Sequence, residues 1–142
     1  MTIEPVDALA ARLNELRPSA TIAVSRSRAS NPRETLDMFV ASLGFQAIGD
    51  GWRQLNKGEA TALLRRVLEH DLAYGVAEME PEQAIALADD CLDTAGVAEY
   101  FTNGAFTNGG WAGHKVAPGT FDTGVAWVGA ESVGILWVQD ED

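Results

Sequence analysis

The sequence predicts an α+β fold, with N-terminal helices packed on a mainly antiparallel sheet that ends in a C-terminal β-hairpin. Two observations carry this prediction. Apolar residues recur at helical spacing through the front of the chain, and two β-rich runs joined by a short turn close it. Helices and strands are thus segregated along the sequence, which is typical of the α+β class. The chain has 142 residues, of which 46% are hydrophobic, so one domain is expected over residues 1–142.

The first helix is expected from Pro5 to about Arg17. Proline suits the first turn of a helix, and apolar residues follow it at helical spacing. Pro18 ends this helix. The partly β-branched run Ala20 to Ser25 then predicts a strand, and the basic segment Arg26 to Arg33 predicts a loop.

A second helix is expected to begin after Asn31, which can cap it, with Pro32 in the first turn. Gly44 provides its C-terminal stop. The triplet Gly49-Asp50-Gly51 is a turn signal, so a β-hairpin is predicted between the runs Phe45 to Ile48 and Trp52 to Leu55.

Two further helices follow. Asn56 is expected to cap the first of them, because Glu59 stands three residues later in capping-box spacing. Residues 72–77 fit either a continued helix or a short strand. The residues Met79-Glu80-Pro81 open the next helix, which runs to about Asp93 and is closed by Gly96. Its predicted inward face consists of Ala84, Ile85, Ala88, Cys91 and Leu92.

The remainder of the chain has β character. Val97 to Thr102 predicts a strand, and residues 103–120 predict a Gly-rich surface loop that carries Trp111. The runs Phe121 to Val128 and Val133 to Val138 are joined by four residues, which predicts an antiparallel hairpin.

Charge is distributed unevenly along the chain. From Glu69 to Asp142 there are fourteen acidic residues and one basic residue, Lys115, whereas residues 1–68 hold seven acidic and nine basic residues. Phosphate binding requires Lys and Arg, so nucleic acid is the least expected partner of the acidic half. A one-signed surface attracts molecules of opposite charge, so a basic protein is the expected partner.

The compartment is expected to be the cytoplasm. The N-terminus shows no secretory signal pattern, and no stretch approaches the roughly 20 apolar residues of a membrane span, so no membrane partner is expected. The single cysteine, Cys91, fits a reducing environment and lies on the apolar side of its predicted helix. The oligomeric state is left open between monomer and homodimer.

Catalytic patterns are sparse, so the chain is expected not to be an enzyme and to bind no cofactor and no metal. His114 and Asp122 could form two members of a hydrolytic triad, but no nucleophile accompanies them. The triplet Asp122-Thr123-Gly124 matches the aspartic protease signature, yet those enzymes need two such carboxylates. A small hydrolase that uses His114 and Asp122 remains an alternative.

Acidic residues near a helix end form the candidate binding site. Acids in the last turn of a helix oppose its dipole, so they do not stabilise that helix, and no basic residues are interspersed among them. A loop tryptophan and the terminal acids complete the expected partner-binding set. The predicted residues are Asp89, Asp90, Asp93, Trp111, Asp140, Glu141 and Asp142.

Three stretches of the second half share a general character with a known class of proteins. They are His70-Asp71-Leu72-Ala73-Tyr74 with the helix that follows, Tyr100 to Gly104, and Phe121 to Val125 running on to Trp137-Val138-Gln139-Asp140-Glu141-Asp142. This part of the chain resembles small acidic bacterial immunity proteins that are encoded beside secreted antibacterial toxins of type VI or contact-dependent systems.

The leading hypothesis is therefore an immunity protein that binds a cognate basic toxin, such as a nuclease, and occludes its active site. Charge complementarity would speed association, and aromatic anchors would slow release. An adaptor or chaperone for a basic partner protein is a further alternative from another functional class.

Overall fold

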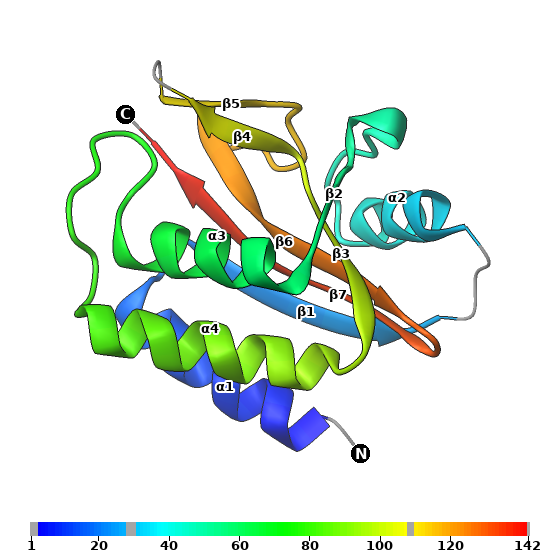
Figure 1. Cartoon of the computed structure of the whole chain (residues 1–142), viewed down its shortest axis with the longest axis horizontal. Coiled ribbons are helices and arrows are strands. Elements are labelled where there is room, and N and C mark those ends of the chain that lie inside the picture. The colour runs from blue at the N-terminus through cyan, green and yellow to red at the C-terminus, as the bar shows by residue number, and fades with distance from the viewer. Residues whose placement is uncertain (1–2, 28–30, 108–109, 142) are drawn as a thin grey trace.

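The computed structural model describes residues 3–27, 31–107 and 110–141, and this part of the chain has the predicted α+β architecture (Figure 1). The helices are α1 (Ile3–Leu16), α2 (Pro32–Ser42), α3 (Lys57–Glu69) and α4 (Pro81–Ala95), with a short 3-10 helix, η1 (Gly49–Gly51). The strands are β1 (Ala20–Arg26), β2 (Arg53–Leu55), β3 (Ala98–Thr102), β4 (Gly104–Thr107), β5 (Gly110–Gly113), β6 (Phe121–Gly129) and β7 (Ser132–Asp140).

Five strands form one antiparallel sheet in the order β1-β7-β6-β3-β2. The C-terminal hairpin β6–β7 is confirmed, with a register that runs from Phe121 opposite Asp140 to Val128 opposite Val133. Strands β4 and β5 pair separately as a two-stranded sheet. The last two long strands of the chain therefore lie inside the sheet, and the early strand β1 occupies one of its edges.

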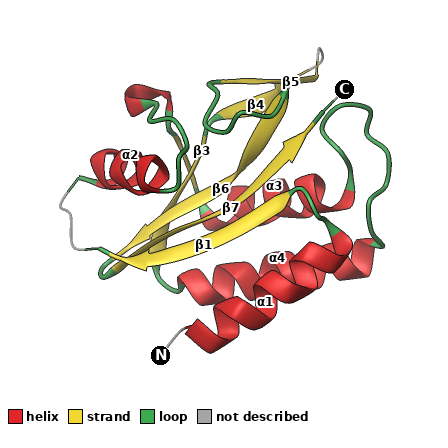
Figure 2. Ribbon diagram, turned by 180° about the vertical axis from the view of Figure 1, so that it is seen from behind, coloured by secondary structure: helices red, strands yellow, loops and turns green. Residues whose placement is uncertain are grey.

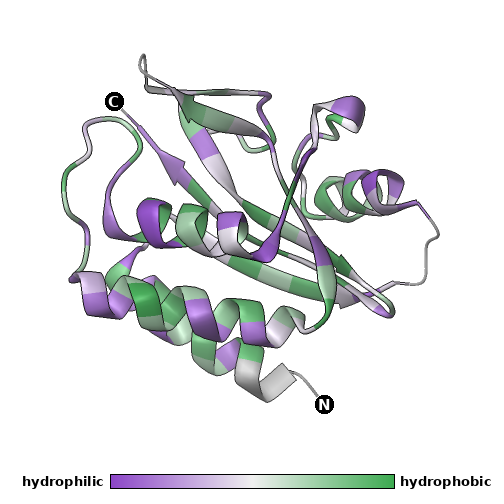
Figure 3. Ribbon diagram, in the orientation of Figure 1, coloured by the Kyte–Doolittle hydropathy of each residue, from purple (hydrophilic) through white to green (hydrophobic). Residues whose placement is uncertain are grey.

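Helices cover both faces of the sheet. Helices α1, α3 and α4 pack on one face, and α2 packs on the other (Figures 1 and 2). Neighbouring strand residues alternate between the two cores, so Trp127 joins the first and Trp137 the second. Strands β6 and β7 consequently bury apolar side chains on both faces, and their central parts are green and white in Figure 3. Burial of one such large side chain stabilises the fold by about 1.5–3 kcal/mol.

The predicted helix boundaries are largely correct because their signals are local. The Asn31 side chain accepts hydrogen bonds from the backbone N–H groups of Arg33 and Glu34. Asn56 and Glu59 form the reciprocal capping box at the start of α3. Gly96 ends α4 with a φ of 67°, a left-handed backbone conformation that favours glycine. None of the described helices has the length and apolar content needed to cross a membrane.

The predicted hairpin between residues 45 and 55 is wrong. Residues 49–51 form η1, and β2 pairs with β3 instead of with residues 45–48. The carboxylate of Asp37 on α2 explains this, because it accepts hydrogen bonds from the backbone N–H groups of Ile48 and Gly49. It also accepts the indole N–H of the buried Trp52 at 2.8 Å. These bonds hold the segment against α2 and away from strand pairing.

Two smaller predictions also need correction. Ile85 is 40% exposed, so it lies outside the buried face of α4. Leu87, which was not predicted to face inward, is buried there. Residues 103–120 are not one continuous loop, because β4 and β5 form within them. Residues 72–77 are neither helix nor strand, apart from a single bridge between His70 and Ala77.

Candidate functional site

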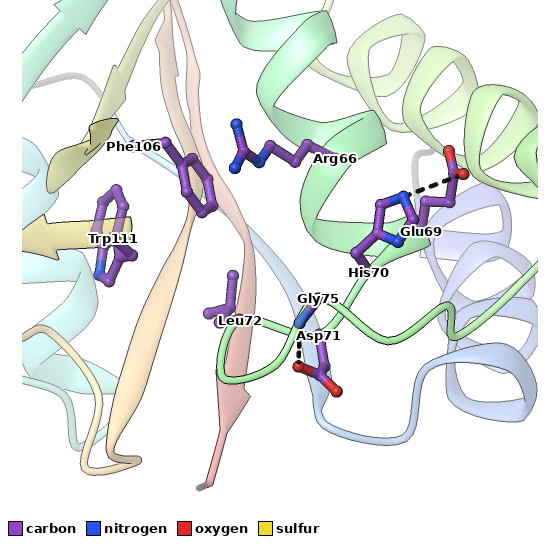
Figure 4. A pocket seen from close by; sticks show the side chains of 8 residues that line it. All are labelled: Arg66, Glu69, His70, Asp71, Leu72, Gly75, Phe106 and Trp111. Atoms are coloured by element: carbon purple, nitrogen blue, oxygen red, sulfur yellow. Dashed lines mark hydrogen bonds and ion pairs between the residues drawn. The ribbon is translucent and has the colours of Figure 1, made fainter. Parts of the chain in front are cut away.

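A pocket of about 560 Å³ lies where the end of α3, the loop of residues 70–80 and the β4–β5 hairpin meet (Figure 4). The loop of residues 70–80 follows the last turn of α3, and the β4–β5 hairpin lies on the other side of the pocket. Side chains of both signs and two aromatic rings therefore face one space. The pocket is lined by Arg66, Glu69, His70, Asp71, Leu72, Gly75, Phe106 and Trp111.

The hairpin provides an aromatic wall. Phe106 and Trp111 are directly opposite each other across β4 and β5, and their ring centroids are 5.4 Å apart. Both side chains are half-buried. The guanidinium of Arg66 lies 3.6 Å from the centroid of the Phe106 ring, in cation–π geometry. Among the described residues, no carboxylate forms an ion pair with Arg66, so its N–H groups can bond to a ligand.

The loop of residues 70–80 is held in one shape by hydrogen bonds. One carboxylate oxygen of Asp71 accepts the backbone N–H groups of Tyr74 and Gly75, at 2.6 and 3.0 Å. The backbone N–H of Asp71 donates to the Val76 carbonyl, and Gly75 adopts a φ of 71°. This loop presents two large apolar side chains to solvent, since Tyr74 is 71% and Val76 is 58% exposed.

A buried ion pair fixes the base of the same loop. Arg17 donates to both carboxylate oxygens of Asp140, at 2.8 and 2.7 Å, and both side chains are buried. Asp140 also accepts the backbone N–H of Leu72 at 2.7 Å. Arg17 in turn donates to the carbonyls of Val67 and His70. The ends of α1, α3 and β7 are thereby joined to the residues that form the pocket floor.

The pKa of Asp140 is lowered from its ordinary value. Burial favours the neutral acid and would raise the pKa. The hydrogen bonds from Arg17, the backbone of Leu72 and the Ser19 hydroxyl, together with the charge of Arg17, outweigh burial. The folded protein therefore stabilises the ionised form of the Asp140 carboxylate.

This shift predicts an acid-dependent loss of stability. An Asp whose pKa is lower in the folded state contributes stability above its unfolded pKa of about 3.9 and loses that contribution as pH falls through the folded value. The free energy of unfolding of the wild type should therefore exceed that of Asp140→Asn at neutral pH, and the difference should shrink below about pH 4. Urea denaturation of the wild type and of Asp140→Asn, from neutral pH to below about pH 4, measures the difference in the free energy of unfolding. A difference that widened in acid would contradict the assignment.

The three predicted acids of α4 lie on its exposed face, and two of them pair with arginines from the front of the chain. Asp90 lies 2.7 Å from Arg12 of α1, and Asp89 lies 3.3 Å from Arg65 of α3. Asp93 is exposed and forms no ion pair with a described residue. These pairs are about half exposed, so each contributes on the order of 0–1 kcal/mol and leaves the face acidic but partly neutralised.

The terminal acids do not act as one tail. Asp140 is 8% exposed and belongs to β7, so its carboxylate is committed to Arg17. Glu141 is exposed and accepts hydrogen bonds from the hydroxyl and backbone N–H of Thr120, which lower its pKa. Asp142 lies outside the described residues. Trp111 is the predicted binding residue that lies in the pocket.

The residues of the hydrolase alternative are not brought into a catalytic pair. Asp122 is buried, and one carboxylate oxygen accepts the backbone N–H groups of Val116 and Ala117 and the indole N–H of Trp137. The exposed His114 ring packs against Gly51, where an added Cβ would lie 2.8 Å from it. Within the described chain, the His114 ring and the Asp122 carboxylate share no hydrogen bond. Asp122 thus anchors the loop that precedes β6.

Other reactive groups are equally confined. Cys91 is fully buried, and burial raises the pKa of its thiol to about 12, so it remains protonated at neutral pH. In the described ranges, no group of three or more His, Cys, Asp or Glu side chains is arranged to hold a metal ion.

Sequence reasoning missed most of the pocket. The pairing of Phe106 with Trp111 was signalled by Asn108-Gly109, because an Asn-Gly dipeptide midway between two apolar residues is a hairpin pattern. Arg66 carried no such signal, since its position beside Phe106 depends on how α3 meets the hairpin. Comparison with models of known protein families, with curated proteins and with solved structures found no match.

Proposed function

We propose that this chain is a cytoplasmic immunity protein that binds a basic antibacterial toxin, such as a nuclease, and occludes its active site without catalysis. One observation supports this proposal above the others. A loop held in one conformation presents exposed Tyr74 and Val76 among acidic residues, directly beside an aromatic pocket. Exposed apolar side chains on a preorganised surface are characteristic of protein-binding sites.

We call this surface the loop face and define it as residues 71–78 with the adjoining pocket. Its charged groups suit a basic partner, because Asp71 and Glu78 flank the apolar side chains and no Lys or Arg occurs between Glu69 and Lys115. Aromatic residues at the centre of an interface supply most of its binding energy, and surrounding charges select the partner and speed its approach. Tyr74 is the natural central anchor.

The acidic face of α4 has a secondary role in this proposal. Because Asp89 and Asp90 already pair with arginines of the same chain, they are less available for direct contact than the acids of the loop. Their charges still contribute to the long-range field that steers a basic molecule toward the protein. The predicted contact site therefore moves from α4 and the terminus to the loop face, and Trp111 is retained.

Growth protection tests the proposal directly. If a toxin gene that encodes a basic protein lies beside this gene, its expression in a bacterial host should stop growth, and co-expression of this chain should restore it. The purified pair should form a stoichiometric complex by calorimetry. Failure of the chain to protect against that toxin, with both proteins folded, would overturn the immunity function.

The loop face predicts which substitutions weaken that complex. Tyr74→Ala should raise the dissociation constant by at least about 30-fold, because truncation of an aromatic hot spot costs about 2 kcal/mol or more. Glu78→Lys should weaken binding through charge reversal, whereas Glu131→Lys makes the same change at the β6–β7 turn, at the opposite end of the sheet, and should have little effect (Figure 1).

Calorimetric titration of each variant measures these effects. Met38→Ala serves as the matched control for Tyr74→Ala, since Met38 is 73% exposed on α2 and lies outside the loop face. Equal losses in the loop-face and control variants would show that the toxin binds elsewhere.

A further inference from the structure

We infer that the pocket receives an uncharged aromatic side chain of the partner protein, together with a main-chain carbonyl that accepts hydrogen bonds from Arg66. This inference deepens the proposed function and rests on it for the identity of the partner. The pocket itself defines the chemistry of the group that it takes, through its apolar walls, its carboxylates and Arg66, which has no ion-pair partner among the described residues.

The walls favour a flat apolar group. Leu72 is buried in the floor, and the half-buried rings of Phe106 and Trp111 form the opposite side (Figure 4). Aromatic pairs with centroids about 4.5–7 Å apart gain energy beyond simple burial, so an inserted ring gains by packing beside Trp111. The volume of about 560 Å³ is sufficient for a large aromatic side chain and part of its backbone.

Charges of both signs line the pocket, so an ionised ligand of either sign meets at least one group of its own sign. A ligand cation would be repelled by Arg66, whose position over Phe106 already fills the cation–π site of that ring. A carboxylate or phosphate would approach the carboxylates of Glu69 and Asp71, which both line the pocket. The Glu69 carboxylate lies 3.2 Å from the His70 Nε2 atom, and one oxygen of the Asp71 carboxylate accepts the backbone N–H of Tyr74. A neutral ligand avoids both penalties.

The free donors of Arg66 then require a neutral acceptor. Its guanidinium is planar, and stacking on Phe106 restricts its orientation. A peptide carbonyl next to the inserted side chain supplies the acceptor without adding charge. Tyr74 and Val76 lie on the same loop, so the segment of the partner that enters the pocket would also cover them.

Three probes that share an indole ring test this inference on the protein alone. N-acetyltryptophanamide is neutral and carries two carbonyls, indole-3-acetate is an anion, and tryptamine is a cation. Amide chemical shifts of the ¹⁵N-labelled chain, titrated at neutral pH, report the site and the affinity. The neutral probe should bind with a dissociation constant on the order of 1 mM, and both ions at least roughly tenfold more weakly, since 1.4 kcal/mol is a factor of ten.

Two pocket variants and one control locate the site. Arg66→Met keeps an unbranched apolar stem but removes the guanidinium donors, and should weaken the neutral probe about tenfold, as expected for a hydrogen bond to a charged group. Trp111→Ala should weaken it by a similar factor. Met38→Ala should leave it unchanged. The spectrum of the remaining residues shows whether each variant is folded, and Trp111→Phe replaces Trp111→Ala if the hairpin is lost.

The outcomes separate the two proposals. Shifts confined to the pocket lining, with the neutral probe preferred, support the inference even if growth protection fails. Absence of binding, preference for either ion, or shifts outside the pocket would overturn it and leave the growth assay to decide the immunity function by itself.

Discussion

Replacement of Arg17 by methionine is expected to lower the free energy of unfolding by about 3–5 kcal/mol at neutral pH, because it leaves a buried carboxylate without its counter-ion. Arg17 is 2% exposed and donates to both oxygens of Asp140. The substitution also removes donors to the carbonyls of Val67 and His70 at the end of α3. The loss is measured by urea denaturation.

An exposed ion pair of the same length is the control. Arg12 lies 2.7 Å from Asp90, but both side chains are about half exposed. Arg12→Met should therefore cost less than about 1 kcal/mol. The double variant Arg17→Met with Asp140→Asn should recover part of the loss, since the buried charge is gone and the amide oxygen can still accept the Leu72 N–H. Similar losses for Arg17→Met and Arg12→Met would show that the buried pair does not anchor the fold.

The same pair illustrates what the sequence could not predict. Arg17 and Asp140 stand 123 residues apart, and no local pattern links them. At the end of the chain, Asp140-Glu141-Asp142 has the composition of a solvated tail. Only the register of β7 beside β1 brings Asp140 next to the end of α1 and buries it.

Local signals, by contrast, predicted most of the fold. Helix caps act within four residues, so Asn31, Asn56 and Gly96 marked helix ends correctly. The C-terminal hairpin joins consecutive strands, and its register follows from its turn. The hairpin predicted at Gly49-Asp50-Gly51 failed because Asp37, from another element, captured that segment.

The candidate site was less predictable because charge along a sequence does not give charge in space. The acidic half contributes α4, yet Arg12 and Arg65 from the front half lie against Asp90 and Asp89. The pocket combines α3, a loop and a hairpin, and of its lining residues only Trp111 was predicted to bind a partner. The exposure of Tyr74 depends on the conformation of its loop, which the Asp71 carboxylate holds through the Tyr74 backbone N–H.

A second large effect is expected at Trp137, and the sheet contains its own control. Trp137 and Trp127 are both fully buried, one in each core. The Trp137 indole donates to the buried carboxylate of Asp122 at 2.9 Å, whereas the Trp127 indole N–H has no partner among the described residues. Substitution by phenylalanine removes the same atoms at both sites, but only Trp137→Phe removes a hydrogen bond to a charge.

Trp137→Phe should therefore destabilise the protein by about 1.5–3 kcal/mol more than Trp127→Phe, the usual contribution of a hydrogen bond to a charged group. Both variants lose packing, and Trp137 also loses part of its edge-on contact with Trp52, at a centroid distance of 5.9 Å. Thermal and urea unfolding of the two variants measure the difference. In Trp127→Phe, removal of an unpaired buried N–H offsets some of the packing loss, which widens the gap. Equal destabilisation would mean that the backbone N–H groups of Val116 and Ala117, with Lys115 at 3.8 Å from the other oxygen, are sufficient to stabilise the Asp122 carboxylate, and that the indole contributes only by filling space.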